Sequence, residues 1–127
     1  MFKKISHTIN VVKSELREKR KSKRSSGWDE LRDEVIKKHA SCAACGSKKK
    51  LQVHHIIPFS NRPELEMDEG NLIVLCMDEF ECHLAIGHGG AFKFYNPNVV
   101  EDAQKFLISN SDVRQLITEY AKTRRLN

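Results

Sequence analysis

The hydrophobic residues fall into short periodic runs that are separated by polar and charged stretches. Part of the first twenty residues is expected to form an amphipathic helix, because four apolar residues recur near helical spacing: Ile5, Ile9, Val12 and Leu16. Residues 21–27, KSKRSSG, are typical of a break or linker. A second helix is predicted over residues 28–39, where Trp28, Leu31 and Val35 share one face.

Two β-rich runs follow this helix. Residues 51–59, LQVHHIIPF, are rich in strand-forming residues, and we expect Pro58 to end the strand. Residues 72–75, LIVL, predict a second strand. A short helix is expected from Cys82 and should end near the glycine-rich residues 87–90.

The C-terminal part predicts two helices. Asn98 is followed three residues later by Glu101, which resembles a capping box with asparagine in place of serine or threonine. The last helix is expected to carry one apolar face, made of Val113, Leu116, Ile117, Tyr120 and Ala121. Short strands between flanking helices predict a small α+β fold.

The composition changes this picture in two ways. A chain of 127 residues with 39% hydrophobic residues fits one small domain with a modest core. No apolar run approaches the roughly 18 residues that a membrane span needs, and the first ten residues carry no apolar stretch of signal-peptide length. We therefore expect a cytoplasmic protein without a membrane partner, whose cysteines stay reduced.

Positive charge is concentrated at the N-terminus. The formal net charge is +5, and nine lysines and arginines lie between Lys3 and Arg24 against two glutamates. A basic arm of this kind is typical of phosphate contact, so DNA is the expected partner. The residues expected to contact DNA are Lys13, Arg17, Arg20, Lys21, Lys23 and Arg24. The alternative is a solvated tail.

The four cysteines form two pairs. Cys42 and Cys45 are separated by two residues, and Cys76 and Cys82 by five. Two such pairs can close a tetrahedral thiolate site for a structural Zn²⁺ ion, although the second spacing requires a wider loop than usual. The alternatives are buried, unligated cysteines or a disulfide pair. A zinc site would add folding free energy to a small core, but says nothing about catalysis.

Four of the six histidines lie between residues 54 and 88. They are His54, His55, His83 and His88, and Asn71 lies between the two pairs. The stretch from Cys42 to about His88 contains the motifs CAACG, LQVHHIIPF, NLIVLC and CHLAIGHGG, and in these it resembles the HNH nuclease family. The following YNPNVVEDA is similar to a phage-borne and bacterial subset of that family.

The resemblance implies a β-hairpin packed on a helix, which is a zinc-stapled ββα-metal core with flanking N- and C-terminal helices. It implies that His55 is the general base and that His54 and His83 are ligands of a catalytic divalent ion. Asn71 would orient the base or join the metal shell. His88 would be a further ligand, but five residues of a regular helix turn about 500°, so it should not share a face with His83 unless the glycines bend the chain.

The chemistry agrees with these roles. A divalent ion such as Mg²⁺ or Mn²⁺ offsets phosphate charge, and a neutral imidazole can take a proton from water at neutral pH. The resemblance implies hydrolysis of DNA to 5′-phosphate and 3′-hydroxyl ends. One objection is that His54 and His55 are adjacent, so on a regular strand they point to opposite faces. One of them would then pack in the core, unless the strand ends, twists or bulges there.

The resulting organisation has three parts. Residues 1–26 form the basic arm, residues 27–96 the nuclease core with its zinc site, and residues 97–127 a helical segment. A non-catalytic zinc-stabilised nucleic-acid-binding module explains the cysteines and the arm equally well, but not the histidines and Asn71 together. A zinc domain that binds proteins is the third reading. If the protein is a nuclease, we expect it in a bacterial host cell, with its gene carried by a phage. We also expect a protein partner that directs cleavage.

Overall fold

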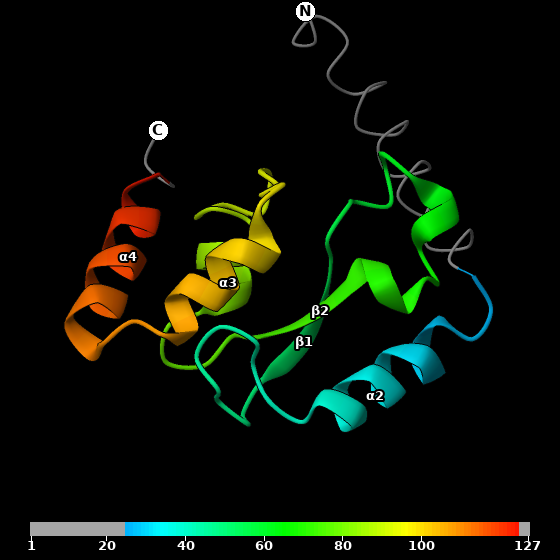
Figure 1. Cartoon of the computed structure of the whole chain (residues 1–127). Helices are drawn as coiled ribbons and strands as arrows, with labels where there is room; N and C mark the ends of the chain where they lie inside the picture. Colours follow the sequence, from blue (N-terminus) through cyan, green and yellow to red (C-terminus); the bar gives the residue numbers. More distant parts are fainter. Residues whose placement is uncertain (1–24, 125–127) are drawn as a thin grey trace, which may run out of the picture.

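A computed structural model describes residues 25–124 of the chain. A two-stranded antiparallel sheet lies at its centre, with helix α2, Trp28–His39, on one side and the two C-terminal helices on the other (Figure 1). This confirms the predicted α+β class and the ββα core. The expected N-terminal helix and the six basic residues expected to contact DNA lie outside the described residues. Within residues 25–124 no helix is long and apolar enough to cross a membrane.

Helix α2, Trp28–His39, has the predicted bounds. Gly27 precedes it with φ 87°, a left-handed conformation that favours glycine. Acidic residues occupy its first turn and basic residues its last, which complements the helix dipole. The helix buries Val35 against the sheet and delivers the chain to the first cysteine pair.

The sheet consists of β1, Leu51–His55, and β2, Leu72–Cys76. The prediction that the first strand extends to Pro58 was wrong, because the chain leaves the sheet after His55. At that point the Ile56 N–H still donates to the Asn71 carbonyl, and both backbone groups of Ile57 then bond to the Asn71 side chain.

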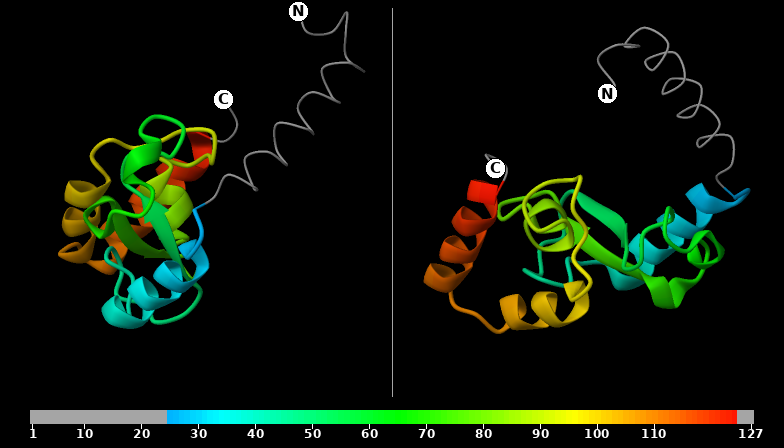
Figure 2. Two further views of the ribbon diagram at one scale, coloured as in Figure 1. Left: turned by 90° about the vertical axis from the view of Figure 1, so that its right-hand side faces the viewer. Right: turned by 90° about the horizontal axis from the view of Figure 1, so that it is seen from above.

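The two faces of the sheet bury different sets of residues. Toward α2, the buried Val35, Leu72 and Val74 form a small cluster that includes the half-buried Trp28 and Val53. On the other face a larger core brings together Leu75, Ile86, Val99, Phe106 and Ala121 with three buried cysteines. The right-hand view in Figure 2 shows the C-terminal helices on the side of the sheet opposite α2, so the sheet separates two small cores.

A π-helical turn, η4, His83–Gly87, follows the second cysteine pair and packs on the sheet. A Cβ atom added to Gly87 would lie 3.1 Å from Leu75 and 3.2 Å from Nδ1 of His54, so glycine allows the close approach. Gly90 has φ 105°, and a Cβ there would lie 2.0 Å from the Ala121 carbonyl oxygen. Two short 3₁₀ turns, Pro63–Leu65 and Glu69–Asn71, complete the connection between the strands.

The chain ends in two helices, α3, Val99–Leu107, and α4, Ser111–Thr123, as predicted. The prediction of a capping box at Asn98 was wrong, because the Asn98 side chain makes no capping bond. The backbone N–H of Asn98 donates instead to Oδ1 of Asn96. Asn110 caps α4 instead, through a bond from the Val113 N–H.

The predicted apolar face of α4 exists but is largely exposed to solvent. Only Ala121 of that set is buried, and the other four side chains are 37–71% exposed: Val113, Leu116, Ile117 and Tyr120. Ala121 and Thr118 face the core instead. Apolar periodicity located a helical face here, but did not show which face is buried.

Candidate active site and metal clusters

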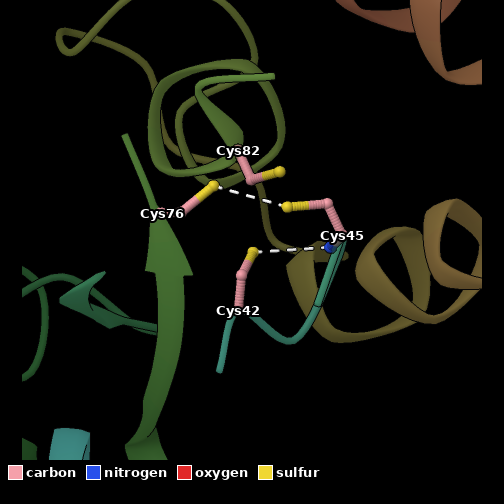
Figure 3. A group of neighbouring side chains, drawn as sticks. All are labelled: Cys42, Cys45, Cys76 and Cys82. Carbon is pink, nitrogen blue, oxygen red and sulfur yellow. Dashed lines mark hydrogen bonds between the residues drawn. The ribbon is translucent and has the colours of Figure 1, made fainter. Parts of the chain in front are cut away.

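The four predicted zinc ligands converge from three parts of the chain (Figure 3). Cys42 and Cys45 lie in the loop after α2, Cys76 ends β2, and Cys82 precedes η4. Their sulfur atoms all lie within 4.8 Å of one another, and the thiols form no disulfide. The cluster supplies four soft ligands, which is the donor set that zinc prefers.

Hydrogen bonds and burial shift the pKa values of the clustered thiols in opposite directions. The Cys76 and Cys82 thiols bond to the Cys42 sulfur and lower the pKa of Cys42 strongly. The same bonds raise the pKa of Cys82, and burial raises the pKa of Cys45 to about 12. A thiolate at Cys42 therefore disfavours loss of the proton from Cys45 and from Cys82. A bound cation is needed to hold all four cysteines as thiolates.

A second cluster contains His54, His83 and His88. His54 lies on β1 and is 4% exposed, while His83 begins η4 and His88 directly follows it. Each offers one ring nitrogen, and these three atoms also lie within 4.8 Å of one another. The Nε2 atom of His54 is buried and has no hydrogen-bond partner, which is unusual for a buried polar atom. A metal ion is a ligand that would satisfy it.

The π-helical turn brings His83 and His88 together. Its backbone bond runs from the His88 N–H to the His83 carbonyl, five residues apart, at 3.1 Å. In this geometry residues i and i+5 lie one above the other, which a regular α-helix does not allow. The objection to His88 as a ligand assumed a regular helix, and the π turn removes it.

Hydrogen bonds fix the orientation of both rings. The Nδ1–H of His83 donates to Oε1 of Gln52 at 2.6 Å, and the Nδ1–H of His88 donates to the Phe94 carbonyl at 2.8 Å. Because each imidazole is protonated at Nδ1, both Nε2 atoms present lone pairs, and these lie only 3.2 Å apart. Two facing lone pairs repel unless a cation lies between them. The donor set therefore fits a divalent ion.

Burial keeps His54 and His83 neutral. Burial and, to a smaller extent, the neighbouring imidazoles lower the pKa of His54 to about 3 and that of His83 to about 4. At neutral pH both rings are uncharged, which is the form that binds metal. The same clustering that disfavours protons favours a divalent cation.

His55 points to the other side of the strand, as the alternation of β1 requires. Its ring stacks on Trp28 of α2, with centroids 4.8 Å apart and planes inclined by 22°. Its Nε2 lies 3.1 Å from the Glu66 carbonyl oxygen. A carbonyl can only accept, so Nε2 carries the proton and Nδ1 is the basic nitrogen.

Despite their opposite directions, the two adjacent histidines reach one pocket. A pocket of about 260 Å³ at the end of β1 is lined by eight residues: Val53, His54, His55, Pro58, Phe59, His83, His88 and Tyr95. The strand ends at His55, so no further strand residue separates its two faces there. The expectation that the strand must end for both histidines to serve one site agrees with this geometry.

Asn71 is buried but does not bond to the imidazole of His55. Its side chain accepts from the Ile57 N–H at 2.8 Å and donates to the carbonyls of Ile57 and Leu65. In the structure this amide therefore does not hydrogen-bond to the base, and its place in a metal shell stays a prediction. Asn71 instead fixes the loop that supplies the Glu66 carbonyl to His55.

Three partners of the histidines were not anticipated. The position of Gln52 contained a signal, because residues two apart on a strand share a face and Gln52 lies two before His54. Trp28 had the weaker signal of a large aromatic residue on the sheet-facing side of α2. The Phe94 carbonyl had none, since any residue supplies that group.

The geometry defines a ββα domain with a four-cysteine cluster and a separate three-histidine cluster. Residues 42–89 match the sequence model of the HNH endonuclease family, so this part of the chain is an HNH-type domain. The match makes it a metal-binding, nuclease-type domain with nucleic acid as its class of substrate. No curated protein and no solved structure matches the chain.

Proposed function

We propose that this protein is a metal-dependent DNA endonuclease that hydrolyses phosphodiester bonds to 5′-phosphate and 3′-hydroxyl ends. The observation that carries the proposal is the buried, unpartnered Nε2 of His54, which faces two further imidazole nitrogens beside His55. A zinc-stabilised binding module needs the cysteines but has no use for such an atom. We assign Zn²⁺ to the four cysteines and an ion such as Mg²⁺ or Mn²⁺ to the histidines.

Different residues of the site have different roles in the proposed reaction. His54, His83 and His88 would hold the divalent ion, which would offset the phosphate charge and stabilise the leaving oxygen. His55 removes a proton from the attacking water through Nδ1, since its Nε2 donates to the Glu66 carbonyl. Trp28 keeps the imidazole ring in one plane, and Asn71 holds the loop that carries Glu66.

Cleavage of supercoiled plasmid DNA tests the proposal. With the zinc-loaded protein and added Mg²⁺ or Mn²⁺, we expect nicked or linear products, and no cleavage without a divalent ion. Linear products should be resealed by DNA ligase without further treatment, because ligase requires 5′-phosphate and 3′-hydroxyl ends. If the protein binds DNA but does not cleave it in the presence of Mg²⁺, Mn²⁺, Co²⁺ or Ni²⁺, the non-catalytic binding module would be supported instead.

Gln52→Leu is expected to weaken divalent-ion binding at the histidine cluster by about 10- to 100-fold, as loss of an outer-shell partner typically does. The change removes the acceptor that orients His83 through its Nδ1–H. Titration of the zinc-loaded protein with Mn²⁺ or Ni²⁺ measures the effect. Gln52→Glu keeps an acceptor and should bind nearly as the parent does. Gln104→Leu makes the same change at an exposed site on α3 and should have no effect. Equal affinities for Gln52→Leu and the parent would contradict the role.

Neutralising the basic arm is expected to weaken DNA binding and flatten its salt dependence. Each lost phosphate contact should reduce the slope of log K against log salt by about 0.9 on duplex DNA. The variant replaces six residues with glutamine in the full chain: Lys13, Arg17, Arg20, Lys21, Lys23 and Arg24. A control variant, Lys105→Gln with Lys122→Gln on α3 and α4, removes two positive charges outside the arm and shows whether the loss per charge is specific to the arm. An unchanged slope for the arm variant would make the arm a solvated tail.

A further inference from the structure

The residues that follow the histidine cluster form an exposed aromatic loop, residues 91–95. Phe92 is 58% exposed and Tyr95 is 41% exposed. The Phe92 ring lies 5.8 Å from the His83 ring and 5.0 Å from the His88 ring, measured between centroids. Tyr95 lines the same pocket as His54 and His55. Two large aromatic surfaces therefore stand open to solvent at the edge of the metal site.

Positive charge accompanies these rings. The Lys93 Nζ atom lies 5.3 Å from the centroid of the Phe94 ring, and the Arg124 Cζ atom lies 5.2 Å from it. Both cationic side chains belong to residues that are exposed. The half-buried Phe94 thus holds two cations beside two exposed rings. Aromatic faces next to cations are the usual surface for single-stranded nucleic acid, where bases stack and phosphates pair with charge.

The aromatic loop is held in place before any ligand binds. The Phe94 N–H donates to the Ala91 carbonyl at 2.9 Å, and the Phe94 carbonyl accepts from His88 at 2.8 Å. Gly90, just before it, packs on the backbone of Ala121 in α4. Because the exposed rings are already positioned, little conformational freedom is lost when a flat ligand stacks on them.

We propose that Phe92 and Tyr95 stack on unpaired nucleobases beside the scissile phosphate, so that the site prefers single-stranded DNA to an intact duplex. The proposal deepens the nuclease function and rests on it for the position of that phosphate. In a duplex the base faces are covered by neighbouring bases, so stacking on protein rings requires bases that are already unstacked. Lys93 and Arg124 contact the adjacent phosphates.

Binding to short oligonucleotides tests this without cleavage. The full-length, zinc-loaded protein is titrated, with no added divalent ion, against an oligothymidine, an abasic strand of the same length and a duplex. The abasic strand keeps the phosphates but has no bases. We expect the parent to bind oligothymidine most tightly, and Phe92→Ala or Tyr95→Ala to lose on the order of tenfold on that strand alone.

Three further variants make the result specific. Phe92→Trp keeps an aromatic face and should bind oligothymidine at least as tightly as the parent. Phe92→Leu keeps apolar volume without a ring and should bind as Phe92→Ala does. Ile108→Ala removes a more exposed apolar side chain from the α3–α4 connection and should change nothing. A Ni²⁺ titration of each variant checks that the histidine cluster remains intact.

The outcomes separate the two proposals. Equal losses on oligothymidine and on the abasic strand, or no loss for either alanine variant, would overturn base stacking. Base stacking without plasmid cleavage would leave a single-strand-binding module and overturn the nuclease. Cleavage with undiminished activity on duplex and no single-strand preference would retain the nuclease and overturn the inference.

Discussion

Replacing Cys45 with serine is expected to release zinc and unfold most of the domain. Structural zinc contributes on the order of 10–16 kcal/mol in small zinc domains, whereas a whole small domain is stable by about 5–15 kcal/mol. Three of the four cysteines belong to the larger core, and Cys45 packs against it, so the site and the core are lost together. Metal analysis and thermal denaturation followed by circular dichroism measure the two effects.

A second substitution at the same position separates loss of the ligand from damage to packing. Cys45→His supplies a nitrogen donor to the remaining three thiolates, and such a mixed set is a normal zinc site. This variant should retain zinc and much of its thermal stability. A Cys45→Ser protein that contained no zinc, yet unfolded at the parent's temperature, would show that the cysteines are ordinary core residues.

The sequence was most informative where chemistry and periodicity agreed. Helix α2 has its predicted bounds because Trp28, Leu31 and Val35 recur on one face with a clear break on either side. The second strand was predicted to within one residue, since its short run of apolar residues contains no polar side chain that could take the backbone out of the sheet. The cysteine pairs were identified as one cluster because thiols at these spacings have few other roles in a reduced protein.

The errors arose where side chains override the backbone pattern. The run after His55 is β-rich by composition, but the Asn71 amide binds both backbone groups of Ile57 and takes the chain out of the sheet. The face of α4 was predicted from apolar spacing alone, and spacing does not show which side the core lies on. The π turn depends on how Gly87 packs on His54 and Leu75, a tertiary contact that local sequence does not encode.

His55→Ala is expected to lower the rate of DNA cleavage by on the order of 10²- to 10⁴-fold, the usual effect of removing a general base. Divalent-ion and DNA binding should remain, because His55 bonds to Glu66 and stacks on Trp28 rather than joining the three-histidine cluster. His39→Ala, at an exposed site in the last turn of α2, is the matched control and should cleave like the parent. Single-turnover cleavage at saturating Mn²⁺ measures the rates.

Titration with the divalent ion distinguishes the base from the ligands. His54→Ala and His83→Ala each remove one of three converging nitrogens, so they should require more Mn²⁺ and recover part of their activity when it is supplied in excess. His55→Ala should remain slow at every Mn²⁺ concentration. All three variants should keep their zinc, because the cysteine cluster shares no ligand with the histidines. If excess Mn²⁺ restored His55→Ala but not His54→Ala, the two roles would be reversed. If His55→Ala cleaved like the parent, His55 would be a structural partner of Trp28 and the base would lie elsewhere.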